Sequence, residues 1–360
     1  MLGIFKFMNK TISKSSIILR LLSLTVLLSL FSRLYAFEEQ RLIIGFGSCA
    51  EQHREQPIWN TIAKHKPELF ILAGDNIYVK GSGESKFTES YKTLSNNPFF
   101  SKFRQSTPLI GIWDDNDYGK SDAGKELKDK ENSKSAFIDF FNYPEVNQLK
   151  DKDVGLFHSR WLDLNGKKIH IILPDTRWYR DRPLRTYLSL EQAKALNLGP
   201  YQPAIDDTTT MLGEEQWSWL EAEFKKPADF KILVSSIQFL NEYSGWETWA
   251  NFPHERRRLL DLIDQYTDNN FIILSGDIHK AEISELQYKE KLIVEVTSSG
   301  LASHIYPKAI NKHRIGETFE ELNYGMLTIK DTGKENGKLS VVASIYNIKG
   351  VEKLSAEVGK

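Results

Sequence analysis

The chain has 360 residues, of which 41% are hydrophobic and 26% are charged. This ordinary globular composition excludes a disordered, collagen-like or coiled-coil protein. Its 47 basic and 48 acidic residues give a formal net charge of -1, so the overall positive field typical of nucleic-acid-binding proteins is absent, and no nucleic-acid partner is indicated.

The first 36 residues have the pattern of a secretory signal peptide. Residues 6–20 carry four basic side chains, residues 21–31 form an apolar run, and Ala36 offers a small residue for cleavage. A membrane anchor is the alternative, but a spanning helix needs about 20 apolar residues. We therefore expect a signal peptide over residues 1–36 and one folded domain over 37–360. The protein would be exported to the bacterial periplasm or beyond, with no stable membrane span after cleavage.

Short apolar runs bounded by Gly, Pro and Asp predict fully buried strands, and stretches with helical spacing predict helices between them. The predicted strands span residues 42–47, 69–73, 109–113, 169–173, 230–235 and 271–274. The predicted helices span residues 58–64, 134–141, 214–225 and 253–266. This alternation indicates an α/β architecture. From residue 281 on, the runs at 292–297, 326–329 and 339–345 suggest a second sheet.

Polar residues follow several of these strands. Cys49 and Asp75 come after the first two, Asp114 and Asp115 after the third, and Asp277 and His279 after the 271–274 run. Sites in α/β sheets form beyond the carboxyl ends of strands, so these side chains are expected to converge. Clustered carboxylates are costly unless cations neutralise them, which favours a site holding more than one metal ion. Two metals can clamp the attacking and leaving oxygens of a phosphoryl displacement.

Cys49 is the only cysteine of the chain, so it cannot form an internal disulfide. It could be a small buried hydrophobe, a metal thiolate or a nucleophile. A nucleophile needs a partner base, and no histidine can be assigned to Cys49 from the sequence. Because carboxylates abound among the strand ends, the thiolate ligand is the preferred interpretation.

The ordered motif series resembles that of the alkaline phosphatase D family, in the calcineurin-like metallophosphoesterase superfamily. The resemblance spans roughly residues 42–330 and implies an α/β sandwich of two β-sheets flanked by helices. It also implies a metallophosphoesterase catalytic domain over 37–360 that acts on phosphate mono- or diesters, in some members on phospholipids. The motifs are Gly47-Ser48-Cys49, Gly74-Asp75-Asn76-Ile77-Tyr78, Trp113-Asp114-Asp115-Asn116-Asp117, Asp175-Thr176-Arg177 and Gly276-Asp277-Ile278-His279.

The resemblance also implies cofactors and roles for individual residues. Known members use iron, held in part by cysteine, together with calcium. Arg177 would grip phosphate oxygens and Asn116 would assist the leaving oxygen, while Asn76, Arg177 and His304 would contact the substrate. Tyr78 could equally be a core residue, Arg177 a structural partner of Asp175, and His304 a residue satisfied by local hydrogen bonds. The implied metal ligands are Cys49, Asp75, Tyr78, Asp115, Asp277 and His279, with Asp75 bridging the metals.

Three positions depart from the usual pattern of the family: Asn116 replaces a histidine, Ser121 an asparagine and Lys80 an acidic residue. Asparagine cannot act as an acid, although it can donate a hydrogen bond to an oxyanion. The expected protein is an exported, metal-dependent phosphoesterase in which a metal-bound hydroxide attacks phosphorus in line. Its partner would be a small phosphate ester or a phospholipid. The alternatives are a phospholipase D-like phosphodiesterase and a degenerate protein that binds metal or phosphate without turnover.

Overall fold

Two mixed β-sheets form the centre of the computed structural model, which describes residues 40–242, 244–333 and 338–359. The predicted signal peptide lies outside the described residues. In the six-stranded sheet the order is β13-β12-β11-β1-β2-β3. Its strands are β1 (Arg41–Gly47), β2 (Leu69–Ala73), β3 (Leu109–Ile112), β11 (Asn323–Asp331), β12 (Leu339–Asn347) and β13 (Glu352–Val358).

The second sheet has seven strands in the order β10-β8-β9-β7-β6-β5-β4. Its parallel centre is β5-β6-β7-β9, with register pairs such as Leu233↔Ile273. Its strands are β4 (His158–Leu164), β5 (Lys167–Leu173), β6 (Phe230–Ser235), β7 (Phe271–Ser275), β8 (Ala281–Tyr288), β9 (Lys291–Ser298) and β10 (Arg314–Phe319).

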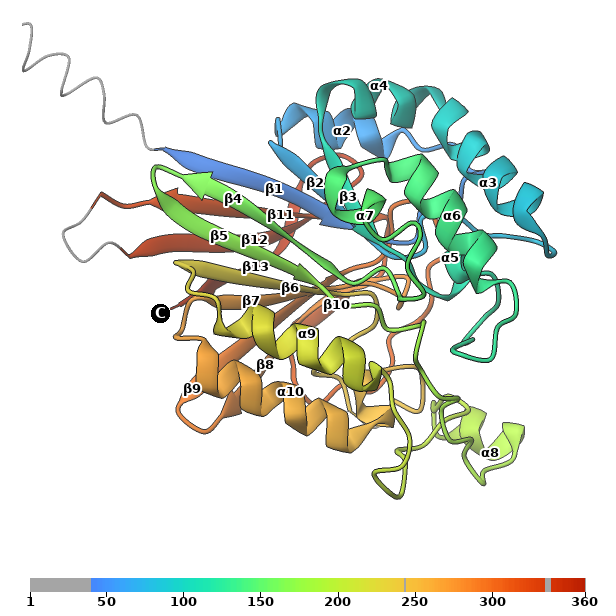
Figure 1. Cartoon of the computed structure of the whole chain (residues 1–360). Helices are drawn as coiled ribbons and strands as arrows, with labels where there is room; N and C mark the ends of the chain where they lie inside the picture. The colour runs from blue at the N-terminus through green and yellow to red at the C-terminus, as the bar shows by residue number, and fades with distance from the viewer. Residues whose placement is uncertain (1–39, 243, 334–337, 360) are drawn as a thin grey trace, which may run out of the picture. The chain divides into compact units, whose positions relative to one another are not determined.

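Helices cover the outer faces of both sheets (Figure 1). The side of the six-stranded sheet carries α2 (Ile58–Lys64), α3 (Glu84–Asn96), α4 (Pro98–Ser106), α5 (Asp115–Tyr118), α6 (Lys130–Phe141) and α7 (Pro144–Asn147). The other elements are α8 (Leu190–Ala195), α9 (Gly213–Lys225), the 3-10 turn η1 (Trp249–Asn251) and α10 (Pro253–Tyr266). Among the described residues, no helix has both the length and the apolar character needed to cross a membrane.

Side-chain alternation along the strands explains why helices and sheets form layers. Ile171, Ile232 and Leu274 point into the main core, which they share with residues of the six-stranded sheet. Their neighbours Leu233 and Ile273 point the other way and join the core beneath α9 and α10. Successive strand residues face opposite sides, so each central strand of the seven-stranded sheet is apolar on both faces. This explains why such strands read as continuous apolar runs.

The predicted fold class, a sandwich of two β-sheets flanked by helices, is confirmed. Helix α9 buries Trp217, Leu220 and Phe224 as its spacing predicts, and α10 spans the predicted range. The prediction of a separate sheet after residue 281 was wrong. Strands β8 to β10 extend the seven-stranded sheet, and β11 to β13 extend the sheet that contains β1. An apolar run reveals a strand, whereas its pairing partner depends on contacts far away in the sequence.

Candidate metal centre

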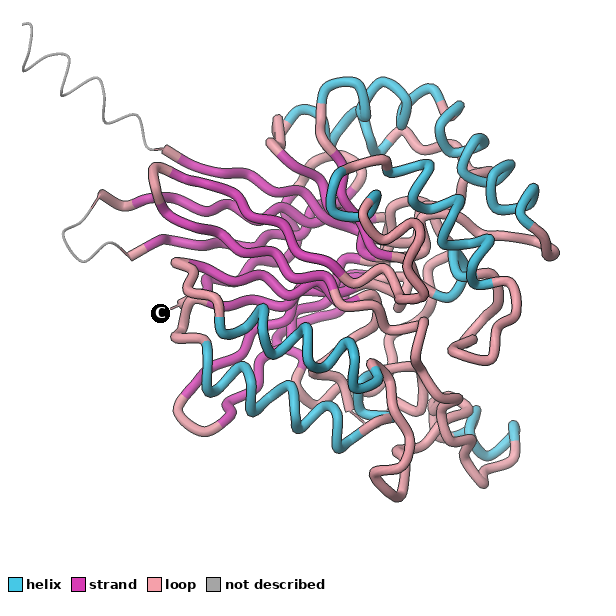
Figure 2. Tube along the Cα trace, viewed as in Figure 1, coloured by secondary structure: helices cyan, strands magenta, loops and turns pink. Residues whose placement is uncertain are grey.

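Loops gather at the carboxyl ends of β1, β2, β3 and β7, where the predicted site residues lie (Figure 2). The thiol, imidazole and carboxylate atoms there form two sets. One set is Cys49, Asp75 and His279, and the other is Asp75, Asp114 and Asp115. Within each set the ligand-type atoms lie within 4.8 Å of one another. Asp75 belongs to both sets, which is the arrangement expected of a carboxylate shared by two cations.

Cys49 is fully buried at the centre of the first set. Its Sγ lies 3.7 Å from Asp75 Oδ2 and 3.1 Å from Ser299 Oγ. Ser299 Oγ also accepts a hydrogen bond of 2.9 Å from the backbone N–H of His279. Ser299 therefore ties together two loops that carry candidate ligands.

Tyr78 contacts His279 of this set. Tyr78 Oη lies 3.0 Å from His279 Nε2, and His279 Nδ1 lies 2.8 Å from the backbone oxygen of His304. A carbonyl acceptor at Nδ1 holds the proton there and leaves Nε2 free to accept or to ligate. The ring of Tyr306 stacks on His279 with 4.6 Å between centroids. His304 therefore acts through its backbone, while its own side chain is exposed.

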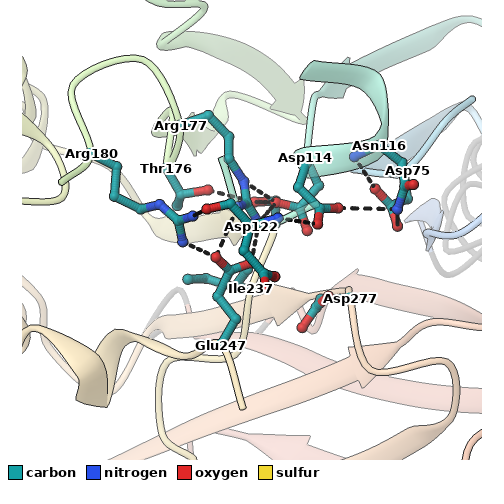
Figure 3. A network of polar contacts seen from close by, with 12 residues as sticks. Asp75, Asp114, Asn116, Asp122, Thr176, Arg177, Arg180, Ile237, Glu247 and Asp277 are labelled. Atoms are coloured by element: carbon teal, nitrogen blue, oxygen red, sulfur yellow. Dashed lines mark hydrogen bonds and ion pairs between the residues drawn. The ribbon is translucent and has the colours of Figure 1, made fainter. Parts of the chain in front are cut away.

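In the second set, Asn116 connects two carboxylates. Its Nδ2 donates to Asp75 Oδ2 at 2.9 Å and to Asp115 Oδ1 at 3.1 Å, contacts that Figure 3 places beside Asp114. The backbone N–H of Asp122 donates to Asp115 Oδ2 at 2.8 Å. By contrast, the buried Oδ2 of Asp114 has no hydrogen-bond partner among the described residues. A buried carboxylate oxygen without a donor fits a cation ligand, because leaving it unsatisfied is costly.

The pKa values of the clustered acidic groups also favour bound cations. Burial, followed by the charges of Asp115 and Asp114, raises the pKa of Asp75 well above its usual range. Burial and the charge of Asp75 likewise raise the pKa of the Cys49 thiol. Burial raises the pKa of Asp114 to about 7, although Arg177 opposes the shift. Burial is the largest cause of each shift, and cations bound among these groups would stabilise their charged forms.

Four candidate ligands have left-handed backbone conformations: φ is +62° at Cys49, +52° at Asp75, +72° at Asp277 and +53° at His279. A non-glycine residue in this region costs about 1–2 kcal/mol. Such strain persists where the surrounding structure imposes it and is concentrated at functional sites. The four strained positions follow β1, β2 and β7, so these loops turn sharply where each strand ends.

Asp277 lies at the edge of the cluster and belongs to neither of the two sets. Figure 3 shows its carboxylate apart from the network of dashed contacts. Burial, followed by the charges of Asp114 and Glu247, raises the pKa of Asp277 well above its usual range. Asp277 is therefore close enough to interact electrostatically with the other carboxylates. Its role as a metal ligand stays a prediction.

Arg177 is fully buried in ion pairs and does not face solvent. Its Nε donates to Asp114 Oδ1 at 2.6 Å, and its Nη1 donates to Glu247 Oε1 at 2.9 Å (Figure 3). Arg180 also binds Glu247. Burial would raise the pKa of Glu247, but Arg177 and Arg180 outweigh it and lower the pKa to about 2. This geometry gives Arg177 the task of orienting Asp114 and does not support the predicted contact with phosphate oxygens.

Asn76 also occupies a structural position. Its side chain is fully buried, its Nδ2 donates to the Ile112 carbonyl at 3.0 Å, and its backbone N–H donates to Asp117 Oδ1 at 2.9 Å. The predicted contact between Asn76 and substrate therefore has no support here. Among the positions that depart from the family pattern, Lys80 and Ser121 are exposed, whereas Asn116 lies within the cluster.

Sequence reasoning missed Glu247 and Asp122 as neighbours of the site. They form a third group with Asp115, again with ligand-type atoms within 4.8 Å. Glu247 is already paired with Arg177 and Arg180, and Asp122 accepts a hydrogen bond from Tyr201. Asp122 lies at the end of the motif that follows β3, whereas no motif marks Glu247, which comes from a loop that reaches the site only in the folded chain.

Several solved structures share the fold of this chain. The structure titled "Structure of PhoD" matches 88% of this chain and 71% of its own with a TM-score of 0.61 at 18% identity. GAP50, "the anchor in the inner membrane complex of Plasmodium", matches 89% of each chain with a TM-score of 0.53 at 12% identity. A dimetal phosphatase from Danio rerio matches 89% of this chain and 99% of its own with a TM-score of 0.50 at 11% identity. At these identities the likeness shows the fold alone.

Sequence comparison identifies the family. Alkaline phosphatase D of Bacillus subtilis (strain 168) is 24% identical over 288 residues, which cover 68% of this chain and 47% of the relative. The chain thus spans about half the length of this curated relative. A sequence model of the PhoD-like phosphatases matches residues 44–325, which contain every residue of the candidate metal centre. The chain therefore belongs to the PhoD-like phosphatase family, as the motif series indicated.

Proposed function

We propose that this chain is an exported, metal-dependent phosphoesterase that hydrolyses phosphate mono- or diesters. The observation that carries the proposal is the position of Asp75 in two ligand sets that share no other residue. Such a shared carboxylate is the hallmark of two adjacent cations, and paired cations suit phosphoryl displacement. Membership of the PhoD-like phosphatase family supports the same reaction class.

The two sets differ in chemistry, so they suit different cations. Thiolate, imidazole and phenol groups from Cys49, His279 and Tyr78 suit a transition metal such as iron. The carboxylates of Asp114 and Asp115 suit a hard cation such as calcium. Asp75 would be shared by the two sites, and Asp277 would be a further ligand. Asp114 enters this proposal because its buried Oδ2 lacks a partner among the described residues.

When bound, such cations supply an activated water for in-line attack and neutralise the charge of the phosphate oxygens. The protein's own residues orient the ligands. Arg177 fixes Asp114, the backbone oxygen of His304 fixes the ring of His279, and Asn116 spans Asp75 and Asp115. Since both Asn116 contacts use Nδ2, assistance to the leaving oxygen by Asn116 would require it to give up one of them. Esters with good leaving groups are therefore the preferred substrates of the proposed site.

The decisive experiment combines metal content with activity on one preparation of the full chain. Iron and calcium are quantified in the purified protein, and hydrolysis of aryl phosphate mono- and diesters is measured before chelation, after chelation and after each metal is restored. Activity that tracks metal content supports the proposal, and comparing mono- with diesters gives the preference. Bound metal without any turnover would instead identify a degenerate binding protein.

Variants test the assignment of residues in the same assay. Asp75→Asn and Cys49→Ser should abolish turnover and lower metal content, because each removes a ligand atom from the proposed sites. Asp139→Asn is the matched control, since Asp139 is an exposed acid on α6 paired with Lys150. Wild-type rates in both ligand variants would contradict the proposal.

Exposed apolar side chains, one of which contacts the site, favour one particular diester, a phospholipid, as a second candidate substrate. Tyr187 and Leu190 are 85% and 81% exposed, and Trp246 and Tyr306 are about half exposed. Tyr306 stacks directly on His279. Large exposed apolar side chains mark interaction surfaces. Turnover of phospholipid vesicles that falls in a Tyr187→Ser/Leu190→Ser variant, with unchanged turnover of a water-soluble diester, would support this substrate; equal losses would exclude it.

A further inference from the structure

A cavity of about 330 Å³ lies beside the candidate metal centre, which it adjoins through Asp122. None of the roles assigned above uses it. Its walls come from the segment that follows α5 and from the loop that precedes α8, with one residue from the loop after α8. The lining residues are Lys120, Ser121, Asp122, Glu126, Arg182, Pro183, Arg185 and Tyr201.

Asp122 connects this cavity to the metal centre. It lines the cavity, its backbone N–H donates to Asp115 Oδ2 at 2.8 Å, and its carboxylate lies within 4.8 Å of ligand-type atoms of Asp115 and Glu247. Arg180 donates a hydrogen bond to the backbone oxygen of Asp122 and so fixes the segment that separates the cavity from the metal centre. Figure 3 shows Asp122 between Arg180 and the Asp114 carboxylate. A ligand held at the metal centre would therefore have the cavity as its neighbour.

The charges that line the cavity are unequally matched. Arg182 is paired with Glu126 at 3.0 Å, and the Asp122 carboxylate accepts a hydrogen bond from Tyr201. Lys120 and Arg185, by contrast, form no ion pair with any residue that the structure describes. The Arg185 guanidinium instead lies 5.7 Å from the ring centroid of Tyr201, over its face. The lining thus holds three basic and two acidic side chains, and the two cations without an ion pair among the described residues offer an anion a site in this wall.

A second hollow continues the first. It measures about 510 Å³ and shares Lys120, Glu126 and Arg182 with it, while Lys128 adds a cation and Asp129 a carboxylate. Lys120 stands where the two hollows meet, so a ligand extending from one into the other would pass its ammonium group. The two hollows therefore form an elongated surface that can follow a ligand leading away from the metal centre.

We propose that this cavity is a specificity subsite for a second anionic group, a phosphate or a carboxylate, carried by the substrate away from the scissile phosphate. Lys120 and Arg185 would bind that group through charge-assisted hydrogen bonds. The substrate class is then a polyanionic phosphate ester, in place of a simple alkyl phosphate. This inference rests on the proposed function, since it takes the metal centre as the seat of the first phosphate.

The test measures binding and needs no turnover. The metal-loaded full chain is titrated calorimetrically with phosphonates of matched chain length, which differ only in a terminal carboxylate. The pairs are propylphosphonate with phosphonopropionate, butylphosphonate with phosphonobutyrate, and hexylphosphonate with phosphonohexanoate. For at least one pair, the wild type should bind the carboxylate-bearing ligand at least about tenfold more tightly than the plain alkylphosphonate. A factor of this size is what one hydrogen bond to a charged group contributes to affinity.

The Lys120→Gln/Arg185→Gln variant should lose that preference and keep the Kd of the plain alkylphosphonate within about twofold, the size of a long-range screening effect. Both residues are exposed, so the variant is expected to fold. Lys92→Gln, which removes an exposed cation from α3, is the control and should retain the preference. A ratio near one in the wild type, or a ratio that survives the double substitution, overturns the subsite. Failure of every phosphonate to bind would instead overturn the proposed function, and the subsite with it.

Discussion

The buried ion pairs of Arg177 allow the sharpest test of how the centre is held together. Arg177→Met keeps most of the side-chain volume but removes the cation between Asp114 and Glu247. Glu247 keeps its contact with Arg180, whereas Asp114 keeps only the hydroxyl of Ser236, at 2.8 Å, as a side-chain donor. The substitution therefore leaves a carboxylate that is fully buried and without a counter-charge.

Removing one partner of a buried ion pair costs about 3–5 kcal/mol, because the remaining charge is left uncompensated. An exposed pair contributes only about 0–1 kcal/mol. The chain supplies such a pair nearby: Arg182 Nε lies 3.0 Å from Glu126 Oε1, and the Arg182 side chain is 72% exposed. We therefore expect a loss of about 3–5 kcal/mol in unfolding free energy for Arg177→Met and under about 1 kcal/mol for Arg182→Met.

Urea unfolding of the chelated protein at neutral pH, followed by circular dichroism, measures both losses. Adding Asp114→Asn to Arg177→Met should cost less than the two single losses combined, because it removes the unpaired charge. The reasoning fails if Arg177→Met destabilises no more than Arg182→Met. It also fails if the two substitutions at Asp114 and Arg177 are simply additive, since the ion pair would then contribute nothing specific.

Three further predictions concern titration, backbone and ligand orientation. Burial lowers the pKa of His158 to about 4, so the unfolded chain binds the proton more readily. The wild type should then lose up to about 3 kcal/mol more than His158→Gln between about pH 6.5 and pH 4 in urea titrations. At Gly74, φ is +101° and an added Cβ would lie 2.7 Å from Asp114 Cβ, whereas Gly166 (φ +82°) has open space. Gly74→Ala should cost about 2–5 kcal/mol in thermal unfolding and Gly166→Ala only about 1–2 kcal/mol; equal losses would contradict the packing argument. Asn116→Ala frees Asp75 and Asp115, so metal affinity should fall about ten- to a hundredfold in competition with a chelator, and an unchanged affinity would refute the orienting role.

Several features could be predicted because they depend on short stretches of chain. Buried parallel strands are apolar on both faces, so β1, β2, β6 and β7 were visible as runs. The residues after them were visible as motifs, and parallel strands bring those residues to one edge. Cys49, Asp75 and His279 accordingly lie together. Asp114 shows the limit of this reasoning. Motif spacing favoured its neighbour Asp115 as the metal ligand, and only the folded structure reveals that Oδ2 of Asp114 is buried without a hydrogen-bond partner among the described residues.

Tertiary structure alone decided the features that depend on distant parts of the chain. Arg177 carried a motif, but its partner Glu247 lies 70 residues further on, in a loop without any pattern. The same holds for the cavity beside Asp122, whose walls bring Lys120 next to Arg185 and Tyr201. The sequence by itself determined the continuous apolar strands, the family and the kinds of ligand atom, since these follow from local periodicity, motifs and residue type, whereas β4, β8, β10 and β13 were not predicted. The partners of each charge, and hence what each one binds, were decided by folding, because long-range contacts are selected by packing and charge compensation over the whole domain.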